Sequence, residues 1–316
     1  MGGLALVLVE VGLRIAGVAP AYRPEALGQW RMQGGLSGMQ TRGPRDGHAF
    51  SLTTNADGLR TDLPRARTPG VPRVALLGDS TVFGWGVNDG ETVADGVAEG
   101  LPGIEVLNAG QPGYSTTQAA WLTGAVVADY QPDLAVYFIP MHDHNRVLVS
   151  DREALLGGDA PVARLRVALA RRSALYQALR ALLFPAADRA FLLPQQPSTE
   201  PRVDRVSDAE RTVALREAAA ALAPHGGRVA VGWLPFQADI QGVGGEDRPS
   251  GPWMRAFADQ TGAPIVDARH CCSGDGLVLP DDPGHLSAAG NRQAGLAIAA
   301  ALEPLLDAGA LRRPDR

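Results

Sequence analysis

Short apolar runs alternate with helix-like segments through most of the chain. The runs end at glycine, proline or polar residues, as buried strands do. The apolar runs are 73–78, 104–110, 133–140, 228–235 and 263–268, and the helical segments are 91–100, 115–130, 208–223 and 251–261. An alanine-rich stretch near the C-terminus predicts a last helix. This alternation is typical of a parallel sheet covered by helices on both faces. We therefore expect a three-layer α/β/α sandwich.

The pattern also divides the chain. The α/β domain spans 71–306, and residues 307–316 form a C-terminal tail. Residues 21–70 are rich in Gly, Pro and Arg, have little periodicity and predict an irregular lead-in. Residues 1–20 form an apolar segment that Glu10 and Arg14 interrupt. This segment has neither the length of a confident membrane span nor the basic start and cleavage site of a signal peptide. Two interpretations stay open: a remnant of a membrane anchor, or an amphipathic helix packed on the domain or on a membrane surface.

An insertion at 147–207 separates the third and fourth apolar runs. It contains the arginine-rich stretch "VARLRVALARRSALYQALRALLF" and then a proline-rich loop. The simplest interpretation is a helix with its Arg face in water and its Leu face packed on the domain. Two sharper interpretations are a lid over a site and a contact with a membrane surface. We favour the lid, because an insertion after a strand of such a sheet lies near the site.

Composition excludes several function classes. The net charge of −5 gives no broad basic surface for nucleic acid. Cys271 and Cys272 are adjacent and make no disulfide framework. His270 lies beside them, but no second ligand cluster accompanies these residues, so we expect no metal. The run that ends at Gly78 carries neither a dinucleotide-binding nor a P-loop motif, so we expect no cofactor.

Polar residues follow the predicted strands, where functional groups of a parallel sheet collect. Ser80 follows the first strand in "GDS", and Gly110 follows the second in "NAG". The third strand runs into His142, Asp143, His144 and Asn145, and the stretch before the last helix holds Asp282 and His285. Together these residues supply a hydroxyl, a carboxylate–imidazole pair and N–H donors. They are the parts of a serine hydrolase.

The chemistry of each part is specific. A serine hydroxyl is a weak nucleophile that needs a neighbouring base. His285 can take the Ser80 proton, and Asp282 can fix the imidazole tautomer. The backbone N–H groups of Ser80 and Gly110 and a side chain of the third loop can face an oxyanion. Each residue alone also has a plain structural interpretation: a helix N-cap for Ser80, a turn for the stretch around Gly110, a surface residue for His285. Only their joint occurrence favours catalysis.

These motifs resemble the SGNH/GDSL hydrolase superfamily. The first block of that family matches "VALLGDSTVFGWGV", the glycine of its second block matches Gly110, and its final Asp-x-x-His block matches Asp282 and His285. The lead-in "TNADGLRTDLPRARTPGVP" and "VEVGLRIAG" resemble bacterial members with an N-terminal membrane anchor. The resemblance covers about residues 50–145 and 260–305. It implies a parallel, flavodoxin-like sheet and a Ser80–His285–Asp282 triad.

One block departs from the family pattern. The family carries Gly-x-Asn-Asp after the third strand, where the Asn side chain is an oxyanion donor. Here the Asn position falls on His142, while Asp143 keeps the family's Asp. His142 can replace the donor through an imidazole N–H. Alternatively His144 or Asn145 supplies it, or the activity is lost or changed. Asp79, Asp143, His144 and Asn145 are therefore candidate site-lining residues.

The resemblance implies a serine esterase or deacylase that hydrolyses acyl esters, acetyl esters among them, through an acyl-enzyme. Its substrate would be a small-molecule, carbohydrate or lipid ester. The family's N-terminal anchor favours an extracytoplasmic or membrane-associated location over the cytoplasm. Two alternatives stay open: an acyltransferase that uses a carbohydrate or lipid acceptor, and a binding protein that keeps the scaffold without catalysis. The oligomeric state does not follow from the sequence.

Overall fold

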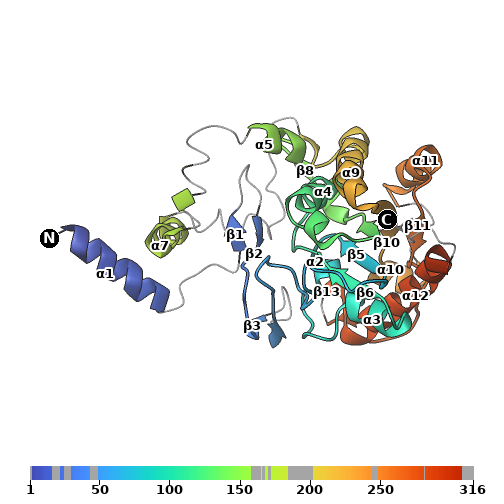
Figure 1. The fold of residues 1–316 in the computed structure, drawn as a ribbon, viewed down its shortest axis with the longest axis horizontal. Helices are drawn as coiled ribbons and strands as arrows, with labels where there is room; N and C mark the ends of the chain where they lie inside the picture. The colour runs from blue at the N-terminus through green and yellow to red at the C-terminus, as the bar shows by residue number, and fades with distance from the viewer. Residues whose placement is uncertain are drawn as a thin grey trace.

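A parallel five-stranded sheet forms the centre of the protein (Figure 1). The computed structural model describes residues 2–15, 22–24, 30–42, 49–157, 165, 168–169, 172–183, 202–243, 248–280 and 282–307. The strands are β5 (Arg73–Leu77), β6 (Glu105–Asn108), β7 (Leu134–Phe138), β10 (Arg228–Trp233) and β11 (Ile265–Asp267). Their order is β11-β10-β7-β5-β6, and every neighbouring pair is parallel. This is the flavodoxin-like order, and it confirms the predicted fold class.

Helices cover both faces of the sheet. On one face lie α4 (Thr116–Ala125), α9 (Asp208–Leu222) and α11 (Gly251–Thr261), and on the other lie α3 (Val93–Gly100) and α12 (Ala288–Asp307) (Figure 1). Along β5, Val74 and Leu76 pack toward one layer, while Ala75 and Leu77 pack toward the other. All four are fully buried. A strand buried on both faces reads as an unbroken apolar run, which is why the sequence locates it so clearly.

Local signals in the sequence fix where three of these helices begin. Thr92, Ser115 and Ser207 each accept a hydrogen bond from the backbone N–H three residues on. The residue at that third position, Asp or Gln or Glu, returns a bond to the cap residue. These capping boxes satisfy N–H groups that have no partner inside the helix. They place the helix starts within two residues of the predicted ones.

The lead-in is more regular than the sequence predicts. It contains β1 (Tyr22–Pro24), β2 (Trp30–Met32), β3 (Met39–Arg42) and β4 (Ala49–Leu52), which form two antiparallel pairs. Strands of three or four residues are too short to show a repeating pattern, so periodicity does not reveal them. Met32, Phe50 and Leu52 are buried against Phe83, which lies in the segment that follows β5. The lead-in therefore forms a small apolar core with that segment.

The insertion is described in part. Its elements are β8 (Arg146–Val147), α5 (Asp151–Gly157), α7 (Ala174–Leu183) and β9 (Val203–Asp204). The N-terminal segment forms α1 (Gly2–Ile15), which packs against α7 at one end of the molecule (Figure 1). Among the described residues, none of the helices has the length and apolar character to cross a membrane. Most of 158–201 and residues 308–316 lie outside the described residues.

The described helices of the insertion do not cover the loop after β5. Helix α5 contacts α4, and α7 contacts α1. Figure 1 draws α7 well apart from α2 (Ser80–Phe83), the short helix that follows β5. A lid formed by the insertion stays a prediction.

Candidate active site

Ser80 is the first residue of α2, and Gly78 and Asp79 separate it from the end of β5. The N-cap of α2 is Asp79, whose Oδ1 accepts hydrogen bonds from the Thr81 backbone N–H at 2.9 Å and the Thr81 hydroxyl at 2.7 Å. The structural interpretation of Ser80 as the helix cap is therefore wrong. A carboxylate one residue earlier satisfies the free N–H, as N-cap side chains do. The Ser80 hydroxyl remains free for another partner.

His285 and Asp282 meet Ser80 from the far end of the chain. Both lie on β13 (Asp282–Leu286), which pairs with β12 (Val278–Leu279) just before α12. His285 Nε2 is 2.8 Å from Ser80 Oγ, and His285 Nδ1 is 2.8 Å from Asp282 Oδ2. Relative exposure is 9% for Ser80 and 4% for Asp282, and 17% for the side chain of His285. The three groups form one hydrogen-bonded line, and His285 is its most exposed member.

The partners of His285 assign its tautomer. An ionised carboxylate only accepts hydrogen bonds, so Nδ1 carries the proton that Asp282 accepts. Nε2 is then an acceptor and takes the hydrogen bond of the Ser80 hydroxyl. Asp282 itself is held by the Gly284 N–H, which donates to Oδ1 at 3.2 Å. This arrangement is the one that lets an imidazole remove a proton from a serine.

The loop after β6 packs tightly against α2. A Cβ at Gly110 would overlap the backbone of Phe83, so this position requires glycine. The Gly110 N–H donates to Asn108 Oδ1 at 3.1 Å, and Asn108 Nδ2 lies 3.5 Å from the Phe83 carbonyl oxygen. Gly110 therefore lies against α2, and its N–H has a partner within its own loop.

His142 lies in the 3₁₀ helix η3 (Met141–His144) after β7. Its Nε2 is 3.6 Å from Asp79 Oδ2, next to Ser80. Its Nδ1 faces Asn145 Nδ2 at 3.4 Å. An amide nitrogen is a donor, so Nδ1 accepts and the neutral ring carries its proton on Nε2. His142 thus holds an N–H donor on the side of the ring that faces the start of α2.

Asp143 does not line this site. It is fully buried, and its oxygens accept bonds from the Thr116 N–H at 2.9 Å, the Thr116 hydroxyl at 2.7 Å and Arg211 Nε at 2.9 Å. Arg211 is also fully buried and stacks on Trp253. Asp143 therefore ties η3 to α4 and α9 through a paired charge, as buried carboxylates require. Burial and the nearby Arg211 lower the pKa of His144, which favours its neutral form.

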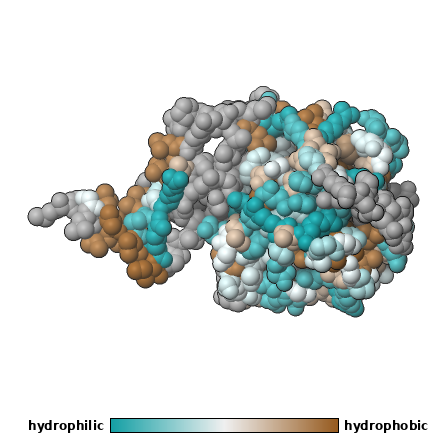
Figure 2. Space-filling view, in the orientation of Figure 1, coloured by the Kyte–Doolittle hydropathy of each residue, from teal (hydrophilic) through white to brown (hydrophobic). Residues whose placement is uncertain are grey.

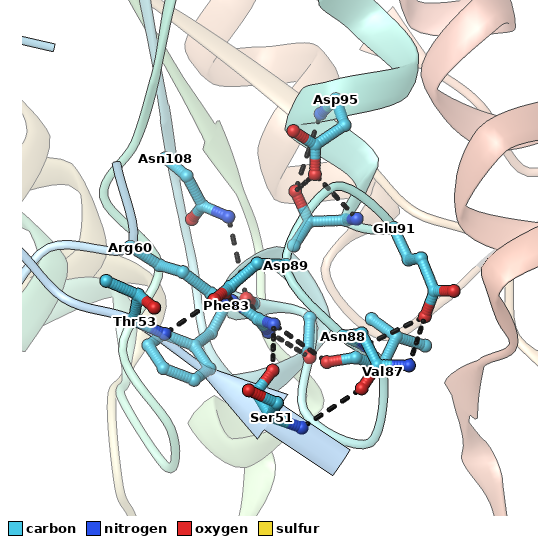
Figure 3. Close-up of polar contacts among 12 residues, drawn as sticks. Ser51, Thr53, Arg60, Phe83, Val87, Asn88, Asp89, Glu91, Asp95 and Asn108 are labelled. Atoms are coloured by element: carbon cyan, nitrogen blue, oxygen red, sulfur yellow. Dashed lines mark hydrogen bonds and ion pairs between the residues drawn. The ribbon is translucent and has the colours of Figure 1, made fainter. Parts of the chain in front are cut away.

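Sequence reasoning missed Arg60, whose side chain is 3% exposed. Its Nη1 donates to the carbonyls of Phe83 at 3.2 Å and Gly84 at 2.6 Å, where α2 ends (Figure 3). Its Nη2 donates to the Val87 carbonyl at 2.7 Å and the Ser51 carbonyl at 3.3 Å. The planar guanidinium offers five donors in a fixed geometry, so one side chain serves four carbonyls.

The loop after α2, which Arg60 contacts, also forms hydrogen bonds with the lead-in. Asp89 Oδ1 accepts from Arg60 Nε and from the Thr53 N–H, both at 3.1 Å, and Asn88 Oδ1 accepts from the Ser51 N–H at 3.0 Å (Figure 3). β4 and the loop after α2 are therefore one hydrogen-bonded unit, which we call the α2 frame (residues 51–60 and 79–91). An arginine in an irregular stretch gives no signal of burial, so pattern analysis does not find it.

The residues present do not form a metal site. Among the described parts of the chain, no group of three His, Cys, Asp or Glu side chains could hold an ion. Cys271 and Cys272 are free thiols whose Sγ atoms lie 2.7 Å apart. Burial raises the pKa of the Cys271 thiol, which disfavours a reactive thiolate.

Comparison with known proteins gives likeness in structure only. No protein-family model and no curated protein matches the chain. A member of the lipolytic protein G-D-S-L family from Veillonella parvula is 13% identical, with a TM-score of 0.43, 75% of this chain and 99% of that chain covered. The acetyl xylan esterase AlAXEase is 13% identical, with a TM-score of 0.44 and coverage of 73% and 99%.

The psychrotrophic esterase EstA from Pseudoalteromonas sp. is 11% identical, with a TM-score of 0.44 and coverage of 74% and 98%. The TM-scores of all three lie below 0.5.

Proposed function

We propose that the protein is a serine esterase of the SGNH/GDSL type, with Ser80 as nucleophile, His285 as base and Asp282 as the group that orients it. The observation that carries the proposal is the continuous line Ser80 Oγ–His285 Nε2 and His285 Nδ1–Asp282 Oδ2, each step 2.8 Å. Residues 205 positions apart meet at hydrogen-bond distance with the tautomer that proton transfer needs.

The reaction follows in two halves. Ser80 Oγ attacks the acyl carbonyl carbon while His285 Nε2 takes the hydroxyl proton. Collapse of the tetrahedral intermediate breaks the ester C–O bond, and His285 returns the proton to the leaving alcohol. Water then attacks the acyl-enzyme, His285 takes a proton from it, and the carboxylic acid leaves as Ser80 regains its hydrogen. Asp282 stabilises the imidazolium in both halves.

The oxyanion would be stabilised by the Ser80 N–H, the Gly110 N–H and the Nε2–H of His142. The position of His142 beside Asp79 supports its inclusion. Gly110 would serve by turning or sharing the N–H that now bonds to Asn108. Removal of one such donor costs about 10²- to 10³-fold in rate. We therefore expect His142→Ala to lose about that factor in kcat, while His142→Asn, which keeps an N–H donor, loses much less.

The test is hydrolysis of p-nitrophenyl acetate and of longer acyl homologues. Wild-type protein should release p-nitrophenol with a burst that reports the acyl-enzyme, and Ser80→Ala should release none above the uncatalysed rate. The same assay with an added saccharide acceptor shows whether the acyl group is transferred to water or to a sugar hydroxyl. Equal turnover by wild type and Ser80→Ala, or release of acyl-saccharide in place of free acid, would contradict an esterase at this site.

A further inference from the structure

Cys271 and Cys272 are the only cysteines of the chain, and they are neighbours in sequence. Both are free and partly buried, in the loop that joins β11 to β12. Their Sγ atoms lie 2.7 Å apart, closer than the about 3.5–4.0 Å at which non-bonded carbon atoms rest. The two thiols therefore face each other, and neither is sealed from solvent.

The adjacency decides what kind of disulfide the pair can form. The Cα atoms of successive residues are about 3.8 Å apart, whereas those of ordinary disulfides are about 4.4–6.8 Å apart. A disulfide between neighbours is therefore strained, and strain makes the bond easier to reduce. Strained and accessible disulfides are the labile and regulatory ones, while structural disulfides resist reduction. A disulfide here would be reversible and would not be a staple of the fold.

The two thiols are not equivalent. Burial and the neighbouring Cys272 sulfur raise the pKa of the Cys271 thiol. Cys271 therefore keeps its proton and donates the hydrogen bond in its contact with Cys272. Because the thiolate is the nucleophile in thiol–disulfide exchange, we expect Cys272 to attack first and Cys271 to follow.

The loop that holds the thiols is connected to the strand of His285. Both cysteines pack against an apolar cluster that includes Leu277 and Leu286, and Leu286 follows His285 on β13. At the far end of the loop, the Ser287 N–H donates to the Leu277 carbonyl at 3.0 Å, and the Ser287 hydroxyl donates to the Gly276 carbonyl at 2.6 Å. A change of backbone at the cysteines therefore acts on the residues that flank His285.

We propose that Cys271 and Cys272 are a reversible oxidation site, at which a low-molecular-weight disulfide converts the two thiols to a vicinal disulfide and slows ester hydrolysis. The Cys272 thiolate attacks one sulfur of the reagent, whose S–S bond breaks and releases one thiolate. The Cys271 thiol then loses its proton and attacks the Cys272 sulfur, and the second thiolate leaves. Two protein thiols are oxidised, and the reagent is reduced to two thiols, which take up the two protons. The effect on hydrolysis rests on the proposed function, whereas the oxidation does not.

The experiment is incubation of the whole reduced protein with oxidised glutathione, followed by its intact mass under non-reducing conditions. The chain has no other cysteine, so a monomer lighter by two hydrogen atoms can hold only this ring. We expect that mass in the wild type and its reversal by reduced glutathione. Cys271→Ser should gain one glutathione at Cys272 instead. Cys272→Ser should gain it about tenfold more slowly or less, because Cys271 keeps its proton.

Hydrolysis of p-nitrophenyl acetate is measured on the same samples. Oxidised wild type should turn over about tenfold more slowly than the reduced protein, because a small displacement of a catalytic base is costly, and reduction should restore the rate. The control is the double variant Cys271→Ser/Cys272→Ser, whose rate should equal that of reduced wild type and ignore the oxidant.

The oxidation site is overturned if the wild type gains glutathione without closing the ring, or if it doubles in mass through a bond between two chains. A ring that forms without loss of hydrolysis would overturn the effect on the reaction. Reduced wild type without hydrolysis would contradict the proposed function and, with it, that effect, while the mass still decides the oxidation site.

Discussion

Around α2 the chain buries polar and charged side chains, whereas along α1 it leaves apolar side chains in water. In the α2 frame, Arg60 is enclosed by four backbone carbonyls and the Asp89 carboxylate. On α1, which Figure 2 shows as largely apolar, Leu8 is 64% exposed and Ile15 is 83% exposed. Both regions depart from ordinary burial preferences, in opposite directions. The difference teaches that a buried polar group holds its surroundings in one geometry, whereas an exposed apolar side chain contributes little to the stability of the fold.

The largest effect is expected in the line formed by Ser80, His285 and Asp282. His285→Ala removes the base that Ser80 needs, so kcat should fall about 10⁴- to 10⁶-fold. Because the His285 side chain is partly exposed, the melting temperature should change little. Kinetics with p-nitrophenyl acetate and a melting curve check both parts. A loss below about tenfold in a folded sample would remove His285 from the mechanism.

Substitution of Arg60 tests whether the stability of the frame depends on this buried guanidinium. Arg60→Met would leave the carbonyls of Phe83, Gly84 and Val87 without this donor, at a cost of about 3–5 kcal/mol in the free energy of unfolding. The matched control is Arg65→Met, because Arg65 is half exposed and pairs with Asp57 and Asp129. It should cost less than about 1 kcal/mol. Denaturant unfolding measures both, and equal costs would show that burial of Arg60 is unimportant.

The same comparison can be made with two leucines. Leu76 is fully buried in β5, so Leu76→Ala should cost about 2–5 kcal/mol of stability. Leu8 is largely exposed on α1, so Leu8→Ala should change the free energy of unfolding by less than about 0.5 kcal/mol. Chemical denaturation of the two variants side by side checks this. A cost at Leu8 as large as that at Leu76 would mean that the Leu8 side chain is buried.

The smallest effect concerns the junction of α1 and α7. The backbone N–H groups of Leu175 and Ala174 lower the pKa of Glu10 to about 2. A carboxyl pKa that is lower in the folded state stabilises the junction above the ordinary pKa of about 4.3. That stabilisation is lost as pH falls from about 4.3 through 2. The amide resonances of Ala174 and Leu175 should therefore titrate with a midpoint near pH 2, and a midpoint near 4.3 would show that the contact is absent.

Much of the fold follows from periodicity, because strands such as β5 are buried on both faces and read as unbroken apolar runs. Ser80, Asp282 and His285 are also recognisable, because each lies in a motif beside a predicted element. The lead-in strands are not, since three or four residues set no period. Arg60 and the orientation of Asp143 depend on tertiary contacts. Nothing in the residues around Asp143 signals that Arg211 turns its carboxylate away from the site.

The most direct test of the central claim is the mass of the intact protein after exposure to a fluorophosphonate, with peptide mapping of the modified residue. The proposed triad predicts one adduct on Ser80 in the wild type, none in Ser80→Ala, and much slower labelling in His285→Ala. A folded wild-type protein that takes no adduct, or takes it on another serine, would contradict the assignment of Ser80 as the nucleophile.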